Sequence, residues 1–234
     1  HSGLIPYVPG EQPEDRSYIK LNTNESPFPP SPLAGIKINE CVSRLNLYPD
    51  PECLILRKKL AEKYGIGIDM ICVGNGSDEI LSFLFNAFFA DSGVVFPDIT
   101  YGFYEVFAQL YRIPYKKIPL REDFSIVPED YMDCGRNIVL ANPNAPTGMA
   151  LSLSDIEKIV LSNREHVVVI DEAYVDFGGE SAIPLTFEYD NLIVVRTFSK
   201  SRSMAGVRLG FSAASKTLTE DMELMRYSTN PYNV

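Results

Sequence analysis

The sequence predicts an α/β fold of three layers, in which a mostly parallel sheet carries helices on both faces. From residue 51 onward, short runs rich in valine and isoleucine alternate with segments of helical periodicity. These runs are apolar at successive positions, which is typical of strands that are buried on both faces. The 234 residues, 45% of them hydrophobic, suffice for one large domain or two small ones.

The first part of the chain has a different character. Residues 1–36 are rich in proline and asparagine. They predict an extended arm that lies over another part of the molecule, because prolines at this density prevent a long helix. Residues 51–66 then place apolar side chains near positions i, i+3 and i+4. This spacing predicts an amphipathic helix, with Gly65 as its stop.

The alternating elements follow in order along the rest of the chain. Strands are expected within 70–76, 93–98, 115–120, 137–144, 166–174 and 191–199. Helices are expected at 77–90, 101–111 and 152–163. The helix at 77–90 is apolar nearly all round, so we expect it to be buried.

Charge and hydropathy exclude several classes of partner. Lys+Arg 21 against Asp+Glu 31 gives a net charge of −10, and no basic cluster exceeds a few residues. Nucleic acid and anionic membranes are therefore poor partners. The longest apolar run, "ILSFLFNAFFA", is interrupted by Ser82 and Asn86 and is shorter than the ~20 residues that span a bilayer.

Cysteine and histidine offer little chemistry. The four cysteines are isolated in the sequence and form no C-x-x-C pair. With no secretory signal visible, they are typical of free thiols in a reduced compartment, so a cytoplasmic location is expected. The one internal histidine, His166, is too little for a zinc site or a Ser-His-Asp triad, and no metal is expected.

Polar and aromatic residues follow the ends of the predicted strands. In strand order they are Gly76, Ser77 and Asp78; Tyr101; Asn142 and Asn144; Asp171 and Tyr174; and Thr197, Ser199 and Lys200. Each of these is common in turns, helix caps or surfaces. Ligands of open α/β sheets, however, bind outside the carboxyl ends of the strands, so we expect these groups to meet at one edge.

The combination suits pyridoxal phosphate chemistry. This cofactor needs a lysine amine for a Schiff base and an acid at its ring nitrogen, as Lys200 and Asp171 could supply. Its phosphate needs backbone N–H groups at a helix N-terminus, hydroxyl groups and an arginine. The turn at Gly76, together with Ser199 and Arg208, offers that set.

The motifs as a whole resemble those of the fold-type I pyridoxal-phosphate-dependent aminotransferases, and most of all the histidinol-phosphate aminotransferases. The matching stretches are "LNTNESPFPPSP", "LYPDPECLILRKKLAEKYGI", "VGNGSDEIL", "TYGFY", "NPNAPTG", "VVVIDEAYVDF" and "RTFSKSRSMAGVRLG". They cover nearly the whole chain in the family's order. The resemblance implies transfer of an amino group between L-histidinol phosphate and 2-oxoglutarate, with pyridoxal 5'-phosphate as cofactor.

The resemblance also implies roles for individual residues. Lys200 would carry the cofactor and shuttle a proton, Asp171 would bond the ring nitrogen, and Tyr174 would donate to the ring oxygen. Tyr101 would stack on the ring. The phosphate would be held by Gly76, Ser77, Asp78, Ser199 and Arg208, with Thr197 in support. Tyr48 would reach the phosphate of a partner subunit across a homodimer interface, so that the two active sites are shared, and Asn24 would lie near the substrate.

The resemblance implies domain boundaries as well. Residues 1–45 would form the N-terminal arm and the start of a small domain, and residues 46–234 the large cofactor-binding domain. The small C-terminal domain of the family, which carries an arginine for the substrate carboxylate, is expected to be absent from this chain.

Some points stay open at the level of sequence. Where the family usually has a second asparagine before "PTG", this chain has Ala145. Either Asn144 reaches the ring oxygen in its place or Tyr174 holds that oxygen alone. Two other activities on the same scaffold are a threonine-phosphate-type decarboxylase and an aromatic aminotransferase. The alternative from another class is a non-catalytic domain that binds the cofactor.

Overall fold

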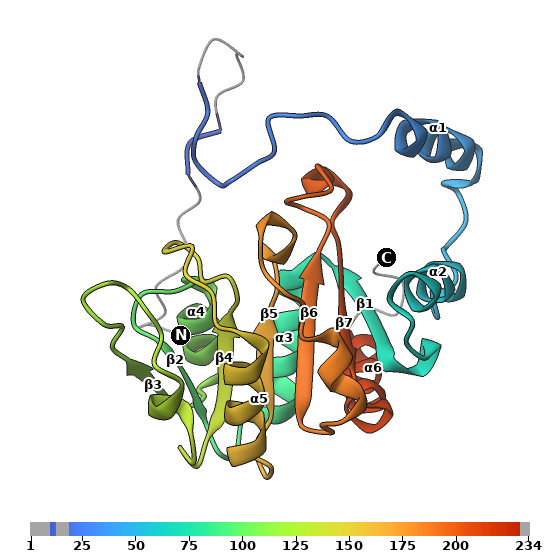
Figure 1. Ribbon diagram of the computed structural model, residues 1–234. Coiled ribbons are helices and arrows are strands. Elements are labelled where there is room, and N and C mark those ends of the chain that lie inside the picture. The colour runs from blue at the N-terminus through green and yellow to red at the C-terminus, as the bar shows by residue number, and fades with distance from the viewer. Residues whose placement is uncertain (1–9, 13–18, 230–234) are drawn as a thin grey trace.

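A seven-stranded sheet organises the chain, as Figure 1 shows for the computed structural model, which describes residues 10–12 and 19–229. The strand order is β3-β2-β4-β5-β6-β7-β1. The strands are β1 (Ile71–Asn75), β2 (Val94–Pro97), β3 (Tyr115–Ile118), β4 (Asn137–Ala141), β5 (Val168–Asp171), β6 (Leu192–Thr197) and β7 (Leu209–Ala214). The central strands β4, β5 and β6 are buried at every position, as their apolar runs predict.

Helices cover both faces of this sheet (Figure 1). The helices that pack on the sheet are α2 (Leu54–Tyr64), α3 (Ser77–Phe88), α4 (Phe103–Tyr111), α5 (Leu153–Ser162) and α6 (Lys216–Thr229), whereas α1 (Pro32–Cys41) lies apart from it. Short 3₁₀ helices are η1 (Val42–Arg44), η2 (Ile68–Met70), η3 (Pro128–Tyr131), η4 (Val175–Phe177), η5 (Ile183–Phe187) and η6 (Ala205–Val207). Side chains of α2 and α5 pack in one apolar core and those of α3, α4 and α6 in the other. The three-layer α/β prediction is confirmed.

The parallel strands end at a common edge. β2 pairs with β3 and β4, β4 with β5, and β5 with β6, all in parallel. The register sets Ala141 of β4 beside Asp171 of β5, and Asp171 beside Val195 of β6. The residues that follow these strands are therefore delivered to one side of the sheet, where ligands of such sheets bind.

Among the strands and α-helices, β7, α6 and α1 were not predicted. β7 runs antiparallel to both β6 and β1, and its small residues lack the β-branched run that marks the other strands. A Cβ at Gly210 would overlap the Gly76 carbonyl carbon and the Ser77 amide nitrogen. Glycine therefore lets β7 approach the turn that precedes α3, and this approach shapes the site described below.

The N-terminal arm follows its expected path in part. Residues 1–9 and 13–18 lie outside the described residues. Residues 19–31 run above the edge at which the parallel strands end (Figure 1). The expectation of extended chain up to residue 36 is wrong at its end, because α1 begins at Pro32, a position where proline suits a helix start. α1 has no buried residue.

No helix in the described part of the chain combines the length and the apolar character that crossing a membrane requires.

Candidate active site

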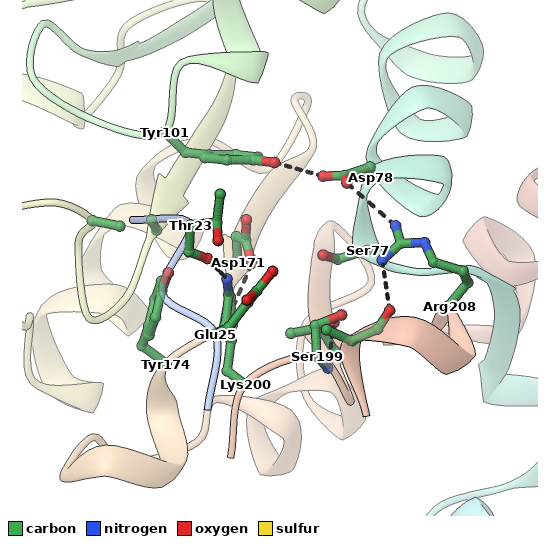
Figure 2. A pocket seen from close by; sticks show the side chains of 15 residues that line it. Thr23, Glu25, Ser77, Asp78, Tyr101, Asp171, Tyr174, Ser199, Lys200 and Arg208 are labelled. Atoms are coloured by element: carbon green, nitrogen blue, oxygen red, sulfur yellow. Dashed lines mark hydrogen bonds and ion pairs between the residues drawn. The ribbon is translucent and has the colours of Figure 1, made fainter. Parts of the chain in front are cut away.

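A cavity of about 220 Å³ opens at the carboxyl edge of the parallel strands. Figure 2 shows its walls, with Tyr101 and Asp78 along one side and Lys200 and Tyr174 along another. The predicted site residues that line it are Ser77, Asp78, Tyr101, Asp171, Tyr174, Thr197, Ser199, Lys200 and Arg208. The structure thus brings together side chains that are up to 131 positions apart, the interval from Ser77 to Arg208.

One wall of the cavity is the N-terminus of α3. Gly76 takes a positive φ of 80° as the chain turns from β1 into this helix, a conformation that favours glycine. A Cβ there would lie 2.6 Å from Nη2 of Arg208. The two glycines, Gly76 and Gly210, therefore allow the helix amides and the Arg208 guanidinium to share one small space.

The hydroxyl groups of β6 and its loop face the same space. The Thr197 hydroxyl donates to Oγ of Ser199 at 3.0 Å and accepts from the Ser199 amide at 3.1 Å. Arg208 forms a long ion pair of 3.6 Å with Asp78. A helix N-terminus with an arginine and hydroxyl groups is a site for a phosphate or a similar anion.

Asp171 is the buried acid of the cavity, with 3% of its surface exposed. Its Oδ2 accepts from the Tyr104 hydroxyl at 2.8 Å and its Oδ1 from the Ala173 amide at 3.1 Å. Burial raises the pKa of Asp171 to about 6, although both hydrogen bonds favour the charged form. Within the described part of the chain, Asp171 has no ion-pair partner. A ligand with a cationic N–H group would satisfy it.

Lys200 reaches the cavity from the loop after β6 (Figure 2). Its Nζ donates to the Thr23 carbonyl at 2.9 Å and lies 5.6 Å from the centre of the Tyr174 ring. The Ser203 amide donates to the Lys200 carbonyl at 3.0 Å and closes a tight turn around the lysine. The Lys200 amine therefore points into the cavity, while the backbone of its loop runs along the rim.

Two tyrosines complete the walls. The Tyr101 hydroxyl donates to Oδ1 of Asp78 at 2.7 Å, which holds the ring over the cavity (Figure 2). The Tyr174 hydroxyl accepts from Nδ2 of Asn24 at 2.8 Å. Asn24 itself lines the adjoining hollow and not this cavity, so its contact with the site runs through Tyr174.

Besides Asn24 and Gly76, two further predicted site residues, Asn144 and Tyr48, do not line the cavity. Asn144 is buried, and its amide accepts from Thr100 and donates to Ile99 and Thr147. Ala145 lines the cavity in its place. The contacts of Asn144 thus hold its own loop, which leaves Tyr174 as the candidate donor to a ring oxygen. Tyr48 is 82% exposed and also lies outside the lining.

Sequence reasoning missed other residues of the site. Tyr104 bonds Asp171 directly, and Thr23 and Glu25 of the arm line the cavity. On a helix of apolar periodicity a tyrosine is expected simply to pack in the core. The available signal for Tyr104 was its hydroxyl, since a buried tyrosine hydroxyl usually has a partner.

Comparisons with known proteins agree with this geometry. A family model described as aminotransferase class I and II matches residues 16–230. The histidinol-phosphate aminotransferase of Brachyspira hyodysenteriae is 50% identical over 234 residues, covering 99% of this chain and 66% of that protein. That of Acinetobacter baylyi is 48% identical, covering 99% of this chain and 65% of that protein. The chain spans about two thirds of the length of these relatives.

Solved structures share the fold. The histidinol-phosphate aminotransferase from Clostridium acetobutylicum aligns with a TM-score of 0.79 at 25% identity, over 91% of this chain and 64% of that one. The enzyme from Sinorhizobium meliloti, solved in complex with pyridoxal-5'-phosphate, has a TM-score of 0.82 at 22% identity, over 91% and 59% of the two chains. Since the family model matches nearly all of the sequence, the chain belongs to the aminotransferase class I and II family.

Proposed function

We propose that this chain is the cofactor-binding part of a pyridoxal-phosphate-dependent aminotransferase that acts on L-histidinol phosphate and 2-oxoglutarate. The observation that carries the proposal is the meeting of Lys200, Asp171 and the Arg208 cradle around one cavity. Relatives about 50% identical that carry the name histidinol-phosphate aminotransferase support the choice of substrate.

The cavity fits the cofactor on two independent points. Asp171 is a buried carboxylate without an ion-pair partner among the described residues, and it suits a protonated ring nitrogen. At the other end, the start of α3 and the Arg208 guanidinium form a cradle for an anion. A Cβ at Gly76 would collide with that guanidinium, and one at Gly210 with the backbone of Gly76 and Ser77, so both glycines keep the cradle open. Ser77, Ser199 and Arg208 line that end and suit a phosphate dianion.

When bound, the cofactor supplies an aldehyde carbon that takes up amines and a ring that withdraws electrons from the substrate α-carbon. Lys200 would provide the amine that holds it and would then move a proton to and from that carbon. A positioned base of this kind contributes a factor of about 10²–10⁴. Asp171 would keep the ring nitrogen protonated, Tyr174 would donate to the ring oxygen, and Tyr101 would cover the ring.

We further propose a cytoplasmic homodimer in which Tyr48 of each subunit serves the site of the other. The exposure of Tyr48 supports this idea, since an exposed aromatic side chain is available to contact a second subunit. Asn24 would lie near the amino donor, beside the Tyr174 hydroxyl that it contacts. Residues 1–45 would act as the arm and the start of a small domain, and residues 46–234 as the large domain.

The test is turnover by the full-length protein. We expect glutamate and a keto product from L-histidinol phosphate and 2-oxoglutarate, and no turnover in Lys200→Ala. Lys216→Ala, a surface lysine with long ion pairs of 3.9 Å, is the matched control and should keep full activity. Release of carbon dioxide from O-phospho-L-threonine, offered in a parallel assay because L-histidinol phosphate has no carboxylate, would indicate a decarboxylase. Faster turnover of aromatic amino acids would indicate an aromatic aminotransferase. Cofactor binding without any turnover would indicate a non-catalytic domain.

A further inference from the structure

Three charged residues are joined by hydrogen bonds directly behind the cavity. Nη1 of Arg196 lies 3.0 Å from Oε2 of Glu172, and Nη2 lies 2.8 Å from Oδ1 of Asp176. The arginine and glutamate side chains are 6% and 0% exposed, and that of Asp176 is 29% exposed. We call these three residues the ionic clamp. Buried charges are costly unless each has partners, and here one guanidinium serves two carboxylates.

Glu172 and Arg196 of the clamp point away from the side of the sheet to which their neighbours Asp171 and Thr197 point. Successive residues of a strand point to opposite faces. Asp171 faces the cavity, so Glu172 faces away, and Thr197 and Arg196 have the same relation. The Arg196–Glu172 ion pair therefore joins the ends of β6 and β5 at positions next to the predicted site residues, and neither side chain lines the cavity.

Asp176 extends the clamp to the loop that carries Lys200. It belongs to η4, directly after Tyr174. Its Oδ2 accepts a short hydrogen bond from the Ser201 hydroxyl and lies 3.2 Å from Nη2 of Arg202. Ser201 and Arg202 are the two residues that follow Lys200. One carboxylate thus connects the turn of Tyr174 with the loop of Lys200.

The loop needs such a connection because it lies beyond the sheet. β6 ends at Thr197, three residues before the lysine, so the strand ladder no longer fixes the backbone at Lys200. Within the loop, the Ser203 amide bonds the Lys200 carbonyl and the Met204 amide bonds the Phe198 carbonyl. These bonds shape the loop internally. Asp176 ties it to the strand end that carries Asp171 and Tyr174.

We propose that Asp176 is a positioning residue that holds the Lys200 loop against the Tyr174 turn, so that the lysine amine stays aimed at the cofactor. The proposal rests on the proposed function, in which Lys200 bonds the cofactor. Asp176 does not line the cavity, so its effect on the lysine is indirect. Misplacement of a reacting group by about 1 Å can cost about 10²-fold in rate.

The experiment compares Asp176→Ala with Asp155→Ala in the full-length protein. Asp155 is the matched control, because it also accepts from a serine hydroxyl, that of Ser152, and pairs with a cation, Lys158, but lies in the first turn of α5. The first readout is the rate at which pyridoxal 5'-phosphate attaches to Lys200 in cofactor-free protein, trapped by borohydride and measured by peptide mass. The second is the Kd of pyridoxamine 5'-phosphate, whose amine cannot bond the lysine.

We expect attachment to slow by about 10–100-fold in Asp176→Ala. The Kd of pyridoxamine phosphate should change less than about threefold, because the phosphate cradle is intact. Asp155→Ala should match the wild type in both readouts. Attachment at the wild-type rate in Asp176→Ala, or equal loss in both readouts, would overturn the proposal. The second result would mean that Asp176 supports the cavity as a whole.

A second variant guards against misfolding. Ser201→Ala removes one hydroxyl and leaves the buried charges in place. It should slow attachment, and combining it with Asp176→Ala should add little further effect, since both remove the same contact. Attachment at the wild-type rate in Ser201→Ala, or a full additional loss when it is combined with Asp176→Ala, would count against the proposal. If the wild-type protein itself fails to attach the cofactor at Lys200, the proposed function fails and not the clamp.

Discussion

The Tyr104 hydroxyl donates to Oδ2 of Asp171 at 2.8 Å, and both side chains are almost wholly buried. Tyr104 is thereby kept protonated, because burial first and the neighbouring Asp171 second raise its pKa well above the ordinary value. Asp171 gains a donor that favours its charged form, against the burial that raises its pKa. The hydrogen bond from Tyr104 therefore lowers the pH at which Asp171, the buried acid of the cavity, becomes charged.

Replacing Tyr104 with phenylalanine should raise the pKa of Asp171 further above about 6. A hydrogen bond to a charged group is worth about 1.5–3 kcal/mol, which corresponds to about one to two pH units. The measurement is the titration of the Asp171 carboxyl in cofactor-free protein by isotope-edited infrared spectroscopy. Asp78 and Lys200 also act on this carboxyl, and both remain in the variant.

The matched control is Tyr131→Phe. Tyr131 is equally buried, but its hydroxyl has no hydrogen-bond partner among the described residues. This variant should leave the titration of Asp171 unchanged. An unchanged titration in Tyr104→Phe as well would show that the tyrosine does not tune the acid.

Asp171→Asn should stabilise the cofactor-free protein at high pH and should remove the activity of the cofactor-loaded protein. The folded pKa of about 6 lies above the ordinary 3.8, so ionisation of Asp171 opposes folding. The penalty is absent below pH 3.8, grows between 3.8 and 6, and is complete above 6. From the size of this shift, the gain is on the order of 3 kcal/mol at pH 8 and below about 1 kcal/mol near pH 4.

Urea unfolding of both proteins at the two pH values measures this difference. A gain in the free energy of unfolding that is the same at both pH values would mean that the effect comes from packing and not from charge. Loss of stability at pH 8 would mean that the charged carboxylate is well satisfied in the cofactor-free fold.

The parts of the site that follow apolar strands could be predicted from the sequence. An apolar run such as that of β5 shows in the sequence where the strand ends. The residues at and beyond these ends, Asp171 and Lys200 among them, meet because parallel strands end at the same edge of the sheet. The partner of Asp171 could not be read in this way, because Tyr104 comes from a helix on another stretch of chain. The partners of Asn144 could not be predicted for a related reason, since its bonds to Ile99 and Thr100 depend on a distant loop.

Gly210→Ala should weaken binding of the cofactor phosphate. The new Cβ would meet the backbone of Gly76 and Ser77, which are parts of the helix start and cannot rotate away as a flexible side chain can. Misfit of this kind costs about 1–3 kcal/mol, so we expect the Kd of pyridoxamine 5'-phosphate to rise about 5–150-fold. Calorimetric titration would measure the Kd.

Gly206→Ala is the control for this substitution. A Cβ at Gly206 has no atom within 4 Å, although the residue lies only four positions away. It should leave the Kd unchanged. Equal weakening in both variants would indicate a general effect on the loop and not a collision at the cradle.

The proposed sharing of sites predicts that two inactive variants restore each other. Tyr48→Phe removes the hydroxyl that would reach a partner's phosphate, and Lys200→Ala removes the lysine. In a mixed dimer, the site with an intact lysine receives its tyrosine from the Lys200→Ala subunit, where Tyr48 is intact. After subunit exchange of equal amounts, about a quarter of all sites should be complete, because half the dimers are mixed and each has one such site.

Steady-state turnover of the mixture, compared with the sum of the separate variants, measures this. Activity equal to that sum, in a sample shown by mass spectrometry to contain mixed dimers, would mean that Tyr48 serves its own subunit or neither.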